Sequence, residues 1–303
     1  MAKIHIVLDI DNVLADRCTL INREFHFLRN GAVLSVNNHL YYIFPGIIPL
    51  LKRLYSYDNV EVSFFSSGTK VRDKELIKKL LILALGEGGY QLIKPTLIVR
   101  SKDDQTLISS RVKVKDLLKI VNVDDLPRTI FVDDEFCFEP QQAHNFLKSQ
   151  KVSANAYSED MGDDSSDYRW QRVNNAYYLA GRLIQLINFL SADPSNTVSN
   201  CLFPIQFNND SSGGYLFNMH VYHDRAIYEY GLAMLQAIDP SLTLVSADFY
   251  RESIETIDFS TNLSPYLPRY YSSLEQGMSV DVSIEEFAEI SLKNRRAYLS
   301  SIR

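Results

Sequence analysis

The chain has 303 residues, of which 46% are hydrophobic, and its formal net charge is −6 at pH 7 with a sequence pI near 5.6. This length and composition predict a folded globule with a sizeable core, while the acidic balance argues against a nucleic-acid partner or attraction to anionic lipid. No apolar run reaches the ~20 residues that a membrane span needs, so we expect a soluble protein with no transmembrane segment.

The first apolar run, Ile4 to Leu8, predicts a buried strand and not a signal peptide, because acidic residues follow it at once. Asp9 and Asp11 come next, one residue apart. At the carboxyl end of a strand, Asp9 can present a carboxylate in line with a phosphorus atom. Asp11 lies on the same side of an extended backbone, where it can protonate a leaving oxygen and later activate a water. Acidic loops after strands are common, but the apolar context on both sides indicates phosphoryl transfer.

Pro45-Gly46 precedes a helix predicted over Ile47 to Tyr55, whose leucines are spaced to make one buried face. A second strand, Val60 to Phe65, ends in Ser66 and Ser67. Their hydroxyl and backbone N–H groups can hold phosphate oxygens. The alternative is an ordinary serine turn, or a cap for the helix predicted over Asp73 to Leu85.

Lys115 and a third strand supply further charges. A lysine ammonium can neutralise both a carboxylate nucleophile and a bound phosphate, although a solvated helical lysine is the alternative. The strand over Thr129 to Val132 delivers Asp133 and Asp134. Mg²⁺ prefers hard oxygen ligands in octahedral geometry, and Asp9, the Asp11 backbone carbonyl and Asp134 would supply them. Apolar strands that alternate with helices predict a parallel α/β sheet.

The remaining chain divides near residue 190. A loop over 155–167 precedes a helix over Trp170 to Leu190, which would close a first domain at 1–190. Residues 191–303 hold 14 acidic against 7 basic residues and predict a mainly helical accessory domain, whose partner the sequence does not identify. The three cysteines, Cys18, Cys137 and Cys201, are widely separated, which suits a reducing compartment and fits neither a disulfide framework nor a zinc site.

The four strand-end segments, in this order, resemble motifs I to IV of the haloacid dehalogenase (HAD) superfamily, over about residues 4 to 190. The branch that they resemble most contains the phosphatases of the RNA polymerase C-terminal domain and the NLI-interacting-factor-like proteins. That similarity rests on Asp9 and Asp11, Pro45-Gly46, Phe65-Ser66, Arg100, Lys115-Asp116-Leu117 and Asp133-Asp134.

The resemblance implies a HAD-like, Rossmann-like α/β fold, and the connections of about 45 residues from motif I to II and from II to III leave no room for a large cap domain. It implies that Asp9 is phosphorylated, that Asp11 is the general acid and base, and that Ser66 and Lys115 bind phosphate. Asp134 would bind Mg²⁺, and Asp133 would orient Lys115. Asp134 stands where this branch usually has Asn, which adds negative charge and leaves the metal preference open.

We therefore expect a Mg²⁺-dependent protein phosphatase with an aspartyl-phosphate intermediate, which modestly favours phosphotyrosine. The alternatives are a phosphoserine or phosphothreonine protein phosphatase, a small-molecule phosphatase, and a catalytically inactive HAD-fold binding protein. Glu285-Glu286-Phe287-Ala288-Glu289 resembles the export element of bacterial type IV effectors, which would place the protein in a host-cell cytoplasm. An ordinary helix with an acidic first turn explains the same residues equally well.

Overall fold

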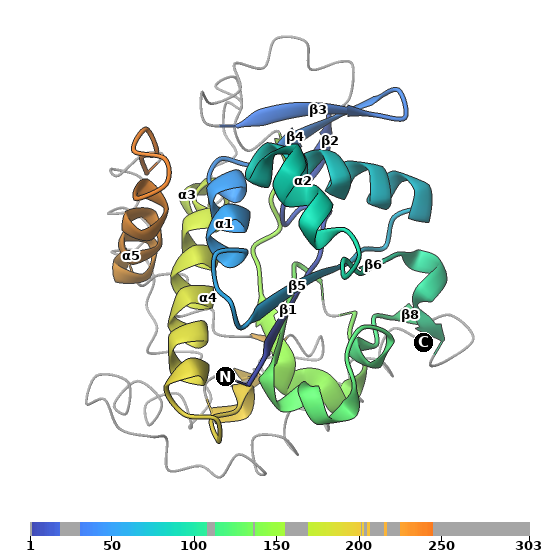
Figure 1. Cartoon of the computed structure of the whole chain (residues 1–303), viewed down its shortest axis with the longest axis vertical. Coiled ribbons are helices and arrows are strands. Elements are labelled where there is room, and N and C mark those ends of the chain that lie inside the picture. Colours follow the sequence, from blue (N-terminus) through green and yellow to red (C-terminus); the bar gives the residue numbers. More distant parts are fainter. Residues whose placement is uncertain are drawn as a thin grey trace.

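A parallel sheet organises the computed structural model, which describes residues 2–18, 31–107, 113–135, 137–154, 169–200, 202, 205–206, 215–216 and 225–244. The sheet has five strands in the order β10-β9-β1-β5-β6, of which Figure 1 labels β1, β5 and β6. Its strands are β1 (Ile4–Leu8), β5 (Val60–Phe65), β6 (Val99–Arg100), β9 (Thr129–Asp133) and β10 (Phe146–Lys148), and each pairs in parallel with its neighbours. The predicted parallel, Rossmann-like α/β fold is thus confirmed.

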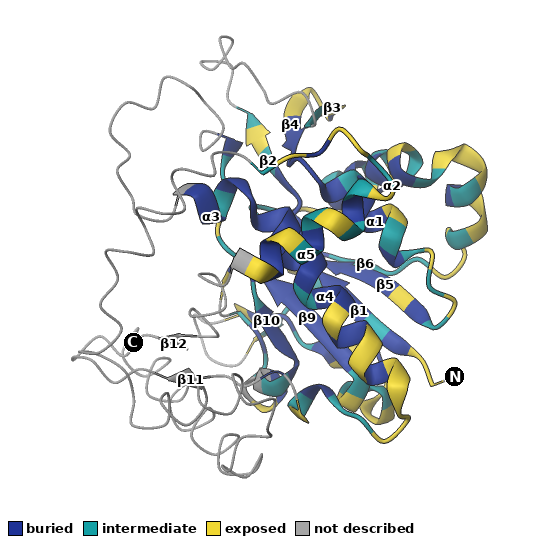
Figure 2. Ribbon diagram, turned by 90° about the vertical axis from the view of Figure 1, so that its left-hand side faces the viewer, coloured by how far each residue is buried: buried dark blue, intermediate teal, exposed yellow. Residues whose placement is uncertain are grey.

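The central strands are buried on both faces, and their side chains alternate between two apolar cores. Ile4, Ile6 and Leu8 of β1 belong to the larger core, whereas Val7 belongs to the smaller one together with Phe131 of β9. Successive strand residues point to opposite faces, so a strand covered on both sides reads as one continuous apolar run. The strands are accordingly almost entirely buried (Figure 2).

Helices α1, α4 and α5 contribute to the larger core, on the same face of the sheet (Figure 2). Helix α1 (Ile47–Leu54) follows Gly46, whose φ of 87° places it in the left-handed region that glycine tolerates best. The smaller core includes Leu117 of η3 (Leu117–Lys119), and Leu126 of η4 (Val123–Arg128) packs against it, while η5 (Pro140–Asn145) contacts β9 and η4. Two further 3₁₀ turns are η2 (Lys102–Asp104) and η7 (Val198–Asn200).

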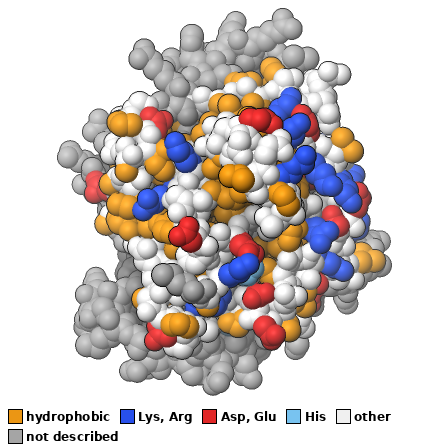
Figure 3. Space-filling model, viewed as in Figure 1, with side chains coloured by type: hydrophobic (Ala, Val, Ile, Leu, Met, Phe, Trp, Pro, Cys, Tyr) orange, Lys and Arg blue, Asp and Glu red, His pale blue; other side chains and the backbone are white. Residues whose placement is uncertain are grey.

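Helix α2 (Lys70–Ile93) is longer than predicted, because it continues beyond Leu85 through a kink at Gly86, where φ is 74°. Its buried stripe begins at Asp73 and continues with Leu76, Ile77, Leu80, Leu81 and Ala84. The opposite face exposes Lys70, Lys74 and Lys78. Basic side chains are correspondingly frequent on the right-hand side of Figure 3, where acidic side chains are interspersed among them.

A small antiparallel sheet lies between β1 and α1 in the chain. It consists of β2 (Ala15–Cys18), β4 (His39–Ile43) and β3 (Ala32–Val36), in the order β2-β4-β3. The sheet lies beyond the carboxyl end of β1, opposite the amino terminus (Figure 1). A shorter pair, β7 (Thr106–Leu107) with β8 (Lys113–Val114), follows β6. Among the described residues, the insertions between the main strands are therefore small.

The helix predicted over Trp170 to Leu190 is divided at Asn174 into α3 (Arg169–Val173) and α4 (Asn175–Ala192). Helix α5 (Arg225–Gln236) packs against α4, and its Ile227 and Tyr228 belong to the larger core. Two short strands, β11 (Ile205–Gln206) and β12 (Tyr215–Leu216), pair with each other.

The division at residue 190 and the mainly helical character of 191–303 stay predictions. Val198, Leu202, Leu235 and Leu242 also belong to the larger core, so several described residues after position 190 pack with the sheet domain. The acidic element at 285–289 lies outside the described residues. Within the described part of the chain, we find no helix with the length and apolar character required to cross a membrane.

Candidate active site

Asp9 lies immediately after β1, at the edge where the parallel strands end. Its side chain is buried, and Oδ1 accepts a hydrogen bond of 2.7 Å from Lys115 Nζ. The same Nζ donates to Asp133 Oδ2, also at 2.7 Å, and Lys115 is only 1% exposed. One buried lysine thus bridges carboxylates from the ends of β1 and β9.

The charges of this buried triad depend on one another. Burial, together with the charge of Asp133, raises the pKa of Asp9 well above its ordinary value, against the opposing effect of Lys115. Burial would lower the pKa of Lys115, but the adjacent Asp133 and Asp9 carboxylates raise it well above its usual range. Lys115 therefore remains a cation despite its burial.

Contacts on both sides fix the orientation of Asp133 and Lys115. Asp133 Oδ1 accepts a hydrogen bond of 2.8 Å from the backbone N–H of Glu135, and Cys137 Sγ lies 3.3 Å from Oδ2. The backbone N–H of Lys115 donates to the Cys137 carbonyl at 2.5 Å. The sequence left open a solvated helical lysine, and this alternative is wrong, because Lys115 precedes η3 and is buried.

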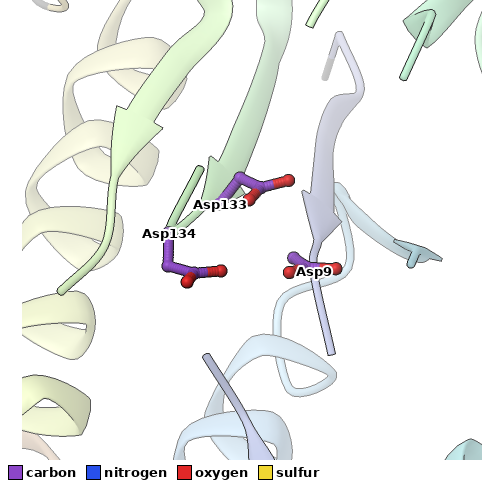
Figure 4. A group of neighbouring side chains, drawn as sticks. All are labelled: Asp9, Asp133 and Asp134. Atoms are coloured by element: carbon purple, nitrogen blue, oxygen red, sulfur yellow. The ribbon is translucent and has the colours of Figure 1, made fainter. Parts of the chain in front are cut away.

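Asp134 completes an acidic group at this edge of the sheet. One carboxylate oxygen from each of Asp9, Asp133 and Asp134 lies within 4.8 Å of the other two. Figure 4 shows that they come from the ends of two neighbouring strands, with the carboxylate of Asp134 directed toward Asp9. Burial, with the charge of Asp133, raises the pKa of Asp134 to about 6.

This acidic group fits a hard divalent cation. Asp134 Oδ2 is buried, and among the described residues it has no hydrogen-bond partner. A buried carboxylate oxygen without a partner is costly, and coordination of a cation would satisfy it. Because Asp133 already accepts bonds from Glu135 and Lys115, Asp9 and Asp134 are the better candidates for ligands. The predicted role of the Asp11 carbonyl stays a prediction.

Asp11 has surroundings quite different from those of Asp9, although only Ile10 separates them. Its side chain is 37% exposed. The two carboxylate oxygens accept hydrogen bonds from Nη1 and Nη2 of Arg72, the latter at 2.6 Å. Ser66 Oγ donates to Asp11 Oδ2 at 3.1 Å and accepts a bond of 2.9 Å from the backbone N–H of Gly68. Ser66 therefore forms a serine turn and also contacts the second aspartate.

The turn that carries Asp11 is fixed by the loop that follows β10. Asn12 takes a left-handed conformation, with φ of 61°, and its N–H donates to the Ala15 carbonyl at 2.8 Å. Its own carbonyl accepts from the N–H of Val152 at 2.9 Å. In the same loop, Ala154 donates to Asp16 Oδ2 at 2.8 Å. Asn tolerates this backbone region better than most residues do.

Ser67 differs from Ser66, because its side chain is exposed and its Oγ accepts a hydrogen bond of 2.9 Å from Gln105 Nε2. The structure thus joins Asp9, Lys115 and Asp133 through hydrogen bonds, places the Asp134 carboxylate within 4.8 Å of the other two aspartates, and groups Asp11 with Ser66. No contact between the Ser67 side chain and either group is seen among the described residues. The phosphate-binding role of Ser67 stays a prediction.

The sequence did not identify Arg72 and Asp73 as members of the site. Arg72 Nε lies 2.6 Å from Asp73 Oδ1, and Asp73 is fully buried. Burial raises the pKa of Asp73 to about 7, although the charge of Arg72 opposes that rise. Burial would lower the pKa of Arg72, but its bonds to Asp11 raise it. The available signal was Asp73 itself, a carboxylate at the first position of the apolar stripe of α2.

Comparison of the sequence with protein-family models gives no match, and comparison with curated proteins gives none either. Among the solved structures that resemble this chain weakly, two carry the name Fcp1. One is the fission yeast RNA polymerase II CTD phosphatase Fcp1, in which an arginine is replaced by alanine, bound to beryllium fluoride. Its sequence identity is 13% and its TM-score is 0.36, and the match covers 84% of this chain and 70% of that one. The other, "The Structure of Fcp1, an essential RNA polymerase II CTD phosphatase", has 14% identity and a TM-score of 0.35 over the same shares.

Proposed function

We propose that the chain is a Mg²⁺-dependent phosphatase of the HAD type, with Asp9 as nucleophile and Asp11 as general acid and base. The observation that carries this proposal is the bridge from Asp9 through the buried Lys115 to Asp133, with Asp134 beside it, at the carboxyl edge of a parallel sheet. Ligand sites of open α/β sheets lie at this edge.

The reaction would proceed in two displacements at phosphorus. An Asp9 carboxylate oxygen attacks the phosphorus atom, the bond to the leaving oxygen breaks, and Asp11 supplies the proton that this oxygen takes up. Asp11, now a carboxylate, then accepts a proton from the water that attacks the aspartyl phosphate. Inorganic phosphate leaves, Asp9 is regenerated as a carboxylate, and Asp11 again carries its proton.

The neighbouring residues would assist by charge and position. Lys115 offsets the repulsion between the Asp9 carboxylate and an incoming phosphate dianion, and Asp133 keeps its ammonium in place. The Ser66 hydroxyl can donate to a phosphate oxygen. Mg²⁺, held by Asp9 and Asp134, would supply further positive charge to the phosphoryl oxygens.

The activity test is phosphate release from a panel of phosphopeptides and small phosphates, with and without Mg²⁺. We expect turnover that requires Mg²⁺ and that Ca²⁺ does not support, because Mg²⁺ demands a smaller and more rigid octahedral site. An absence of release from every member of the panel at saturating Mg²⁺ would favour the inactive binding protein.

For the substrate we propose phosphotyrosine in proteins, modestly favoured over phosphoserine and phosphothreonine. Asp9 is only 5% exposed, which suits a phosphate carried on a long side chain. A phenolate leaving group, with a pKa of about 10, also needs less help from Asp11 than an alkoxide does. The measurement is kcat/KM on matched peptides that differ only in the phosphorylated residue, and equal or better turnover of phosphoserine would reject the preference.

One alternative concerns the substrate, and two further parts of the proposal concern regions beyond the described site. A small-molecule substrate remains the competing hypothesis, and the same panel separates it from a phosphoprotein. Residues 191–303 would bind a partner or position the substrate. The acidic element at 285–289 would direct export as a type IV effector, and a reporter fusion that is exported equally well without this element would exclude that role.

A further inference from the structure

Arg72 uses all three of its guanidinium nitrogens at the candidate site. Nε pairs with Asp73, while Nη1 and Nη2 bind the two carboxylate oxygens of Asp11. Nη2 also lies 3.3 Å from Ser66 Oγ. The guanidinium therefore has one edge on a buried carboxylate and the other on the proposed acid and base.

The carboxylates that contact the two edges of the guanidinium differ in their exposure to solvent. Asp73 is fully buried, whereas the Asp11 side chain is 37% exposed. The ring of Tyr41, a buried residue of β4, lies 5.7 Å from Arg72 Cζ. Gly68 leaves space for the outer edge, because a Cβ at that position would lie 1.5 Å from Nη2. The Nε edge of the guanidinium thus forms an ion pair of 2.6 Å with a buried carboxylate, and its two Nη groups face a partly exposed carboxylate that an anion from solvent can replace.

In this arrangement Asp11 cannot act as the acid, because both of its oxygens accept hydrogen bonds from a cation. The donors that hold it, two parallel N–H groups of an arginine and a serine hydroxyl, also match the oxygens of a phosphoryl group. A phosphate dianion carries more charge than a carboxylate, so it competes well for the same fork.

We propose that Arg72 is a phosphate-binding residue that exchanges Asp11 for the phosphoryl group of the substrate. This inference rests on the proposed function and deepens it. Binding of the phosphate frees the Asp11 carboxylate, which then takes up from water the proton that it later donates to the leaving oxygen. After inorganic phosphate departs, Asp11 gives a proton back to water and returns to Arg72 as a carboxylate. In the free protein, the Asp11 carboxylate thus accepts hydrogen bonds from the same donors that later bind the phosphoryl group of the substrate.

The test compares Arg72→Met and Arg72→Lys with Arg53→Met. Arg53 of α1 is the matched control, because its guanidinium also lies over a tyrosine ring. Its Cζ is 5.1 Å from the centre of the Tyr57 ring. The readouts are KM and kcat for an aryl phosphate and the inhibition constant of inorganic phosphate. We expect Arg72→Met to raise KM and the inhibition constant together by at least about tenfold. Arg72→Lys should restore part of the loss, and Arg53→Met should change neither constant.

A lower kcat with an unchanged inhibition constant for phosphate would overturn the inference, because Arg72 would then act only through Asp11. A second variant, Gly68→Ala, keeps the arginine but places a Cβ 1.5 Å from its Nη2 and 2.5 Å from Asp73 Oδ1. The guanidinium must then move, so this variant should weaken phosphate binding even if Arg72→Met does not fold. Unchanged phosphate binding in Gly68→Ala would also count against the exchange.

Direct calorimetric binding of inorganic phosphate, in the presence of Mg²⁺, separates this inference from the proposed function. If the wild-type protein releases no phosphate from any substrate but binds inorganic phosphate in a manner that Arg72→Met weakens, the inference stands and the phosphatase activity does not. If it hydrolyses substrates and the Arg72 variants bind phosphate normally, only the inference is lost. A wild-type protein that neither binds nor hydrolyses would overturn both.

Discussion

The surroundings of Asp9 and of Asp11 differ in burial, in the cation that pairs with each, and in where that cation comes from. Asp9 is buried against a lysine that a second carboxylate holds, whereas Asp11 is partly exposed and faces an arginine from the first turn of α2. Burial raises the pKa of Asp9, and its lysine opposes that rise. Two identical side chains separated by one residue thus acquire separate chemistry from their neighbours, as pairs of carboxylates in active sites do.

Replacement of Asp9 should have the largest effect. Asp9→Asn should abolish turnover, because an amide is too weak a nucleophile to form the acyl phosphate, while the fold should survive. The measurement is steady-state phosphate release, with Asp58→Asn, an exposed carboxylate, as the control. Normal turnover by a folded Asp9→Asn protein would exclude Asp9 as the nucleophile.

Replacement of Asp11 should be costly but incomplete. Loss of general acid and base catalysis is typically worth ~10²- to 10⁴-fold in rate, so Asp11→Asn should retain measurable activity. The loss should be greater for an alkyl phosphate than for an activated aryl phosphate, whose leaving group needs little protonation. An identical loss on both substrates would contradict the role of proton donor.

Replacement of Lys115, the cation that pairs with Asp9, should lower the free energy of unfolding. Lys115→Met would leave two buried carboxylates without their cation, and breaking a buried pair in this way costs about 3–5 kcal/mol. Urea denaturation should show this loss in the free energy of unfolding. The double variant Lys115→Met/Asp133→Asn should recover part of it, about 0.5–3 kcal/mol. A loss below about 1 kcal/mol in the single variant would mean that the triad contributes little.

The smallest effect concerns the negative charge that Asp134 adds to the acidic group. Asp134→Asn should weaken Mg²⁺ binding by about tenfold, the equivalent of 1.4 kcal/mol, because one anionic ligand becomes neutral. The Mg²⁺ dependence of the thermal unfolding midpoint measures this without any reference to turnover. Asp103→Asn, an exposed carboxylate in η2, is the control. An equal Mg²⁺ dependence in both variants would show that the negative charge of Asp134 does not strengthen Mg²⁺ binding.

The Asp9 side of the site could be predicted from the sequence, because strand ends meet by topology. Ile4–Leu8 and Val60–Phe65 are strands with the predicted bounds, and Thr129–Asp133 extends one residue beyond the prediction. Once these strands are parallel neighbours, the residues that follow them must share an edge. The apolar pattern that predicts the strands and the parallel pairing of β1 with β9 therefore place Asp9 beside Asp133 and Asp134.

The Asp11 side could not be predicted in the same way. Arg72 and Asp73 stand in a charged run at the start of α2, where an exposed helical face is the ordinary interpretation. Only the tertiary contact with the turn after β1 makes them part of the site. Tyr41, whose ring lies beside Arg72, is buried in a strand of an antiparallel sheet, and the alternation of short apolar runs with helices did not predict that sheet.

The missing side chain at Gly68 has a consequence for how related sequences can vary. Any larger residue there would displace the Arg72 guanidinium, so a change at position 68 alters the contacts of position 72. A chain that keeps the arginine should keep the glycine, and a chain with a bulkier residue at the first position should carry a shorter or uncharged one at the second. The pair should therefore covary among homologues, and that pattern would show which of them share this arrangement of the second aspartate.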